Sequence, residues 1–160
     1  MIKKLAFLAT IVLLTCSLSA QRRMATDDLI VTFTIQPIQS IQISPRTVNF
    51  ALLYGGHGRG LYEPRTININ YNITATGAPQ RITARLNERM PDNTVLSILA
   101  DPPRNATRAG WVDLTMSEQT IVSNVRDVHQ SHLLMYLRMT ADVGAPIGTH
   151  TRRITFTLQD

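Results

Sequence analysis

The first residues in this sequence that could do chemistry are two histidines, His129 and His132, in an H-x-x-H pattern. On a helix, imidazoles at positions i and i+3 share a face and can bind one metal ion, whereas on a strand they point to opposite sides. The chain offers no cysteine near them and no obvious carboxylate except Asp127. Because a metal site needs more ligands than this, we favour a surface or loop role for both histidines.

Three aspartates form a second candidate set: Asp101, Asp113 and Asp142 stand near the ends of expected strands. If they met at one end of a β-sandwich, their oxygens could bind calcium, but aspartate is equally an ordinary turn residue. The sequence has no G-x-S-x-G nucleophile elbow and no outstanding pair of carboxylates for acid–base catalysis. We therefore expect no catalytic residue and no cofactor, and predict that the protein is not an enzyme.

One segment, Tyr54–Pro64, is rich in glycine (YGGHGRGLYEP). A phosphate-binding glycine loop would be followed by a helix whose N-terminus faces the anion. The residues that follow instead alternate between apolar and polar side chains, as a strand does, so the phosphate hypothesis fails on context. We expect a loop here, and its side chains His57, Arg59 and Tyr62 are candidates for contact with a ligand.

The N-terminus has the pattern of a secretory signal peptide. Lys3 and Lys4 precede the apolar run Leu5–Leu14, and the small residues Ser17, Ser19 and Ala20 follow it. We expect cleavage after Ala20 or one residue earlier, a flexible leader over residues 21–28 and a single domain over residues 29–160. The alternative, a lipid anchor on Cys16, is disfavoured because threonine is a poor residue to precede a lipidated cysteine.

These features place the protein in the periplasm, on the cell surface or outside the cell, with no stable membrane insertion. The formal net charge is +5, but both lysines lie in the signal segment, and the remaining basic residues are arginines scattered among acids. A nucleic-acid interface requires a clustered basic face. We therefore expect no nucleic acid among the partners.

The rest of the chain has the period-two alternation of short strands separated by turn residues. The expected strands are Leu29–Gln36, Ile38–Ser44, Thr47–Leu53, Thr66–Ala75, Gln80–Asn87, Thr94–Ala100, Trp111–Met116, Thr120–Val125, His132–Thr140 and Thr151–Asp160. This pattern predicts an all-β protein, an immunoglobulin-like or jelly-roll β-sandwich of about 8-10 short strands. A helix over Arg126–Met139 is the one alternative, because apolar residues recur there at helical spacing.

Two stretches resemble small exported bacterial β-sandwich subunits, the chaperone–usher pilins and the spore coat protein U group. They are Ile41–Phe50 (IQISPRTVNF) and the ending from Thr140 through Pro146 and Gly148 to Leu158. The sequence departs from many pilins in lacking a cysteine pair and in using only arginine as its basic residue after the signal. The resemblance implies a non-enzymatic structural subunit of a surface filament, fimbria or coat.

The resemblance also implies assembly by β-strand donation, in which the N-terminal extension of one subunit completes the fold of the next. Leu29, Val31, Phe33 and Ile35 share one face of the expected first strand and are the candidate donor residues. The implied partners are a second copy or a related subunit, and a periplasmic chaperone.

Two alternatives stay open. Leu29–Gln36 is either such a donor or simply the first strand of its own sandwich. The protein is either an assembly subunit or a monomeric exported module that binds carbohydrate or a protein partner through the Tyr54–Pro64 and Asp101–Gly110 loops.

Overall fold

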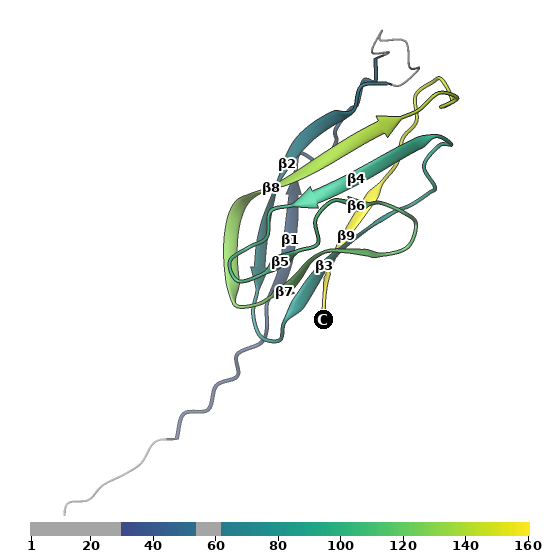
Figure 1. Ribbon diagram of the computed structural model, residues 1–160. Helices are drawn as coiled ribbons and strands as arrows, with labels where there is room; N and C mark the ends of the chain where they lie inside the picture. The colour runs from purple at the N-terminus through teal and green to yellow at the C-terminus, as the bar shows by residue number, and fades with distance from the viewer. Residues whose placement is uncertain (1–29, 54–61) are drawn as a thin grey trace, which may run out of the picture. The chain divides into compact units, whose positions relative to one another are not determined.

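The computed structural model describes residues 30–53 and 62–160 (Figure 1). The chain divides into two units, residues 1–35 and residues 36–160, and every described strand belongs to the second. The described residues form no helix, and their nine strands are β1 (Gln39–Ser44), β2 (Arg65–Ala75), β3 (Gln80–Leu86), β4 (Thr94–Ala100), β5 (Thr107–Arg108), β6 (Val112–Asp113), β7 (Gln119–Val125), β8 (Val128–Ala141) and β9 (Ile154–Gln159). The prediction of an all-β protein is confirmed.

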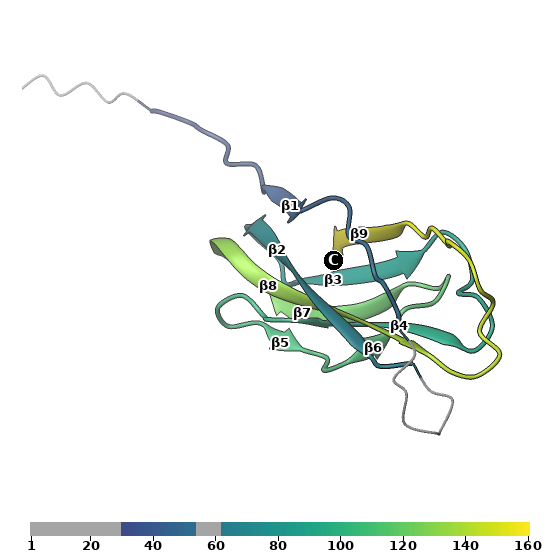
Figure 2. The ribbon, with the colours of Figure 1, turned by 90° about the horizontal axis from the view of Figure 1, so that it is seen from above.

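The strands form two antiparallel sheets that are layered as in a sandwich (Figures 1 and 2). The five-stranded sheet has the order β1-β2-β8-β4-β6, and the four-stranded sheet has the order β5-β7-β3-β9. β1 and β9 are therefore edge strands, each with a single partner, and they contact each other on one side of the sandwich. The side of the sandwich where these two edges meet is called the open side.

The core lies between the two sheets and follows from the alternation in the sequence. On β2, Ile69, Tyr71 and Ile73 are buried while the asparagines between them face outward. On β3, Ile82 and Ala84 are fully buried, as their inward positions in the sequence predicted. Because each strand presents one apolar face, the two faces can cover each other and exclude water.

Tyr71 is the one large core residue with a polar group. Its hydroxyl donates a hydrogen bond to the backbone carbonyl of Asp101, which satisfies the only polar atom of the side chain. Burial raises the pKa of the Tyr71 hydroxyl well above its usual value, and the charge of Asp101 adds to the effect. Tyr71 thus stays neutral and structural.

Several predicted boundaries are wrong. Thr47–Leu53 forms no strand, and the closing strand begins at Ile154 rather than Thr151. The expected strand Trp111–Met116 shrinks to the two residues of β6, and a short strand, β5, lies inside the expected Asp101–Gly110 loop. Each error falls where a strand's pairing depends on a distant segment, which local alternation does not reveal.

The long strand β8 settles the helix alternative. It starts at Val128, earlier than expected, and pairs with β2 on one side and β4 on the other. A helix over Arg126–Met139 is therefore excluded. The register between β2 and β8 shifts near Asn72, and His132 lies in that irregular stretch with a positive φ of 60°.

Residues 30–36 form no strand and belong to neither sheet. The role of Leu29–Gln36, as a donor or as a first strand, stays a prediction. Leu29 and the predicted signal and leader lie outside the described residues. Within the described ranges there is no helix long and apolar enough to cross a membrane.

The core assignment can be tested on β4. We expect Ile98→Ala to lower the free energy of unfolding by about 2–5 kcal/mol, because Ile98 is fully buried and its truncation leaves a cavity. Val95→Ala in the same strand is the control, since Val95 is 41% exposed and should cost less than about 1 kcal/mol. Urea unfolding followed by circular dichroism measures both, and equal losses would contradict the assigned faces.

Candidate functional site

The open side of the sandwich carries a groove between its two edge strands. The groove has a volume of about 800 Å³ and runs between residues 43–52 on one side and residues 145–156 on the other. We call these the first side and the second side of the groove. Its floor is formed by core residues of the five-stranded sheet, among them Ile69, Leu96 and Leu137.

The groove is lined mainly by apolar side chains that the fold leaves partly open. Val48 and Phe50 on the first side, and Ile154 and Phe156 on the second, pack against the core yet are only half-buried. Phe156 and Ile154 point inward from β9 by the same alternation that buries the β3 residues opposite them. Apolar surface between two sheets that is only half covered favours an additional apolar element.

The backbone along the groove also lacks partners. β9 pairs with β3 along one edge and with no other strand of the described chain along the other. Residues 46–52 form no backbone hydrogen bond with any described residue, which is why this apolar stretch is not a strand despite its sequence. Both sides of the groove thus offer free N–H and C=O groups to an incoming strand.

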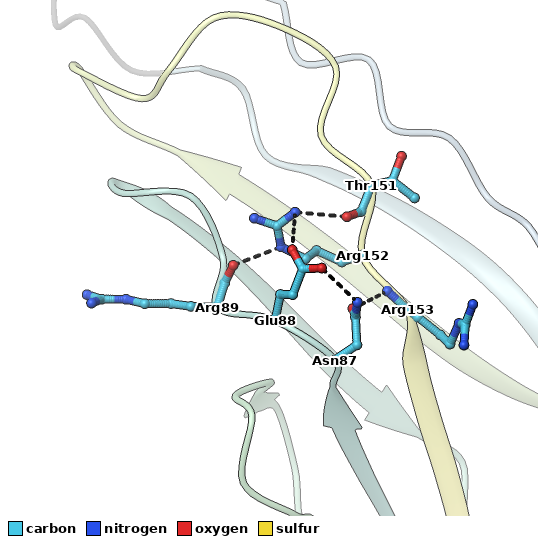
Figure 3. Close-up of polar contacts among 6 residues, drawn as sticks. All are labelled: Asn87, Glu88, Arg89, Thr151, Arg152 and Arg153. Carbon is cyan, nitrogen blue, oxygen red and sulfur yellow. Dashed lines mark hydrogen bonds and ion pairs between the residues drawn. The ribbon is translucent and has the colours of Figure 1, made fainter.

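A polar network fixes the second side where it enters β9 (Figure 3). The Asn87 backbone N–H donates to the Arg153 carbonyl at 3.0 Å, and the Arg153 N–H donates to Asn87 Oδ1 at 2.7 Å. The side chain of Asn87 therefore extends the β3–β9 ladder by one step beyond the last strand pair.

Arg152 completes this network from the other direction. Its Nε donates to the Arg89 carbonyl and one terminal nitrogen donates to the Thr151 carbonyl, both at 2.8 Å. The same terminal nitrogen lies 3.6 Å from a carboxylate oxygen of Glu88, an ion pair that is solvent-exposed on the Glu88 side and therefore weak. The guanidinium holds the turn after β3 against the segment that precedes β9.

Three of the four predicted donor residues are described, and they are exposed; Leu29 lies outside the described residues. Val31, Phe33 and Ile35 have 71%, 77% and 83% of their surfaces accessible, and Ile30 has 87%. Three large apolar side chains on alternate residues are thus left in water by the chain's own fold. We call residues 29–36 the arm.

The predicted ligand residues are only partly placed. Tyr62 lies on the groove wall, while His57 and Arg59 lie outside the described residues. The glycine-rich segment therefore borders the groove at one described residue, which the sequence did not predict.

The candidate metal ligands have ordinary partners. On β8, His129 Nδ1 lies 2.8 Å from the Thr74 hydroxyl. The backbone N–H of His132, not its imidazole, donates to Asn72 Oδ1 at 2.9 Å. Asp113 accepts a hydrogen bond from the Ser97 hydroxyl at 2.7 Å. In the part of the chain that the structure describes, no three His, Cys, Asp or Glu side chains are grouped to hold a metal ion.

The other two aspartates are also occupied locally. Asp101 lies 3.9 Å from Arg108, and the Asp142 carboxylate accepts the N–H of Val143 at 2.6 Å. The structure therefore does not bring Asp101, Asp113 and Asp142 together as one site. Their turn and strand-end roles account for them.

A second, polar recess lies by β1, β2 and the irregular stretch of β8. It has a volume of about 450 Å³, and its lining includes Gln42, Asn70, Asn72 and His132. The outer face of the same sheet carries the chain's one tryptophan, Trp111, whose ring lies 4.2 Å from the Arg138 guanidinium carbon. Trp111 is 40% exposed, so its ring is accessible on this face.

Comparison with known proteins finds no match: no protein-family model, no curated protein and no solved structure matches the chain. The site must therefore be interpreted from its own geometry.

The polar network predicts a local effect on stability. We expect Asn87→Ala to lower the free energy of unfolding by about 1 kcal/mol, because it removes the hydrogen bond that Arg153 donates to the side chain. Glu88→Gln is the neighbouring control and should change stability by less than about 0.5 kcal/mol, since it removes only a long, exposed ion pair. Hydrogen exchange of the β9 amides should rise in the first variant alone, and equal exchange in both would contradict the role of Asn87.

Proposed function

We propose that this protein is a structural subunit of a bacterial surface filament, fimbria or coat, assembled by β-strand donation. In this proposal the arm of one copy lies in the groove of the next. The observation that supports it is a match within one chain: an exposed segment with alternating apolar residues, and an apolar groove with unpaired backbone on both sides. Within the described chain, the apolar side chains of the segment stay exposed and the backbone along the groove stays unpaired.

The dimensions of the two parts agree. An extended segment of seven residues such as 30–36 spans roughly 23 Å, and the six residues of β9 span roughly 20 Å at about 3.3 Å per residue. Of β9, only Ile154 and Phe156 line the groove, so the arm would pair with the start of β9 and with residues 145–153 before it. Val31, Phe33 and Ile35 would then face the half-buried Phe50 and Phe156 across the groove.

The energetics favour a long-lived joint. Burying each of Leu29, Val31, Phe33 and Ile35 contributes about 1.5–3 kcal/mol, and backbone pairing adds a row of hydrogen bonds. The completed domain would be an immunoglobulin-like sandwich in which the donated strand covers the open side. Before assembly the exposed groove is a risk for aggregation, so we also propose an exported chaperone that covers it.

A monomeric binding module is the second candidate function. It rests on two separate features of the five-stranded sheet, the exposed Trp111 and the polar recess by β1 and β2, because aromatic rings and amide side chains each suit contact with a carbohydrate. Trp111 is the only tryptophan, so its fluorescence reports directly on this face. A saturable fluorescence change with one oligosaccharide of a panel, abolished by His132→Ala, would favour this function.

The arm provides the first test of strand donation. We expect the full-length protein to form ladders that resist detergent and collapse on boiling. Phe33→Asp should abolish the ladders, because a carboxylate cannot enter an apolar groove without losing its hydration. Thr34→Asp is the matched control on the opposite face of the arm and should keep the ladders. Gel electrophoresis with and without boiling measures all three proteins.

The groove provides the complementary test. Val48→Asp should also abolish the ladders, whereas Ala51→Asp, at an exposed residue that does not line the groove, should keep them. Circular dichroism of both variants checks that the fold is intact. A wild-type protein that remains a monomer under all these conditions would contradict strand donation.

A further inference from the structure

Each side of the groove carries an exposed arginine with no partner in the described structure. Arg46 lies on the first side, directly after Pro45, and Arg153 lies on the second, directly before β9. Neither guanidinium makes a hydrogen bond or an ion pair with a described residue. Arg152, which directly precedes Arg153, differs because its guanidinium already pairs with Glu88 and donates hydrogen bonds to two backbone carbonyls.

The groove has no charge of opposite sign to balance these arginines. No aspartate or glutamate is among the described residues that line it, and His150 adds a further basic group on the second side. The Coulomb field in a low-dielectric apolar groove is stronger than the same charges would produce in open water. An incoming strand with carboxylates at a suitable position would therefore be favoured.

The arm has such carboxylates at one end only. Asp27 and Asp28 directly precede Leu29, whereas Gln36 and Pro37 at the other end are uncharged. The basic pair Arg22-Arg23 stands at least four residues before Asp27, roughly 13 Å in an extended chain, which exceeds the Debye length of about 8 Å at physiological salt. The charge of the arm close to its apolar run is therefore negative and lies on the N-terminal side.

We infer that the groove selects a donor strand whose apolar run is preceded by carboxylates, with Asp27 and Asp28 of one copy pairing with Arg46 and Arg153 of the next. This inference rests on the proposed strand donation and adds to it a rule for partner choice and direction. β1 and β9 contact each other, and the groove lining ends near them at Ile43 and Phe156, so Arg46 and Arg153 both lie toward that end of the groove. The rule places the N-terminal end of the donor there, and the donor then runs from Arg153 toward residue 145, antiparallel to the second side.

The test uses a full-length acceptor that cannot donate, carrying Val31→Asp and Phe33→Asp, and a labelled synthetic peptide of residues 21–37. We expect the association rate at an ionic strength of 0.15 M, where the Debye length is about 8 Å, to fall about threefold when the peptide carries Asp27→Asn and Asp28→Asn. Arg46→Gln with Arg153→Gln in the acceptor should give the same fall, with little further loss when both changes are combined. In 1 M salt, where the Debye length is about 3 Å, the differences should disappear.

A second peptide serves as the charge control. Arg22→Gln with Arg23→Gln changes the net charge by the same amount but lies far from the apolar run, so its association rate should change by less than twofold. Arg46 and Arg153 are exposed and make no side-chain contacts of their own in the described structure, so the acceptor variant should fold normally. Circular dichroism checks this.

Direction is measured by disulfide trapping in a Cys16→Ser acceptor that carries Thr155→Cys, at an exposed residue of β9. A peptide with Thr26→Cys should be trapped, and a peptide with Gln36→Cys should not. If the wild-type peptide does not bind at all, strand donation itself is wrong. If it binds, but at a rate that the charge variants leave unchanged, or if it is trapped through position 36, strand donation stands and the charge rule is wrong.

Discussion

The structure depends on one constraint: two apolar sheet faces must be covered along every side, and one side is left open. Backbone pairing covers the strands inside each sheet, but β1 and β9 each end a sheet with an unpaired edge. Between them the core reaches the surface through half-buried residues such as Phe50 and Phe156. Buried apolar area is the main stabilising term in folding, so this opening leaves part of that term unrealised within one chain.

The open side is nevertheless held in a defined shape. Asn87 and Arg152 tie the turn after β3 to the segment before β9, so the second side keeps its position although β9 has a single partner strand. The first side has no such ties, since residues 46–52 form no backbone hydrogen bond with the described chain. The two sides should therefore differ in local stability, with the first side the easier one to adjust when a strand binds.

The polar residues that first suggested chemistry have structural roles. The His129 ring lies within hydrogen-bond distance of the Thr74 hydroxyl, the backbone N–H of His132 donates to Asn72, and Asp113 accepts a hydrogen bond from Ser97 across a strand pair. These contacts lie on the outer face of the five-stranded sheet, away from the groove. The groove itself presents apolar side chains, free backbone groups and two arginines.

Much of this protein can be predicted from the sequence, because alternation is a local property of a strand. The apolar and polar faces of β2 and β3 and the all-β class follow from residues such as Ile73 and Ile82 alone. Pairing is different, since it joins distant segments. The sequence of Thr47–Leu53 alternates as well as any strand, yet only the tertiary structure shows that residues 46–52 form no backbone hydrogen bond within the described chain. The groove arises from that missing neighbour, so its position was decided by topology, where the two edges meet, rather than by any local pattern.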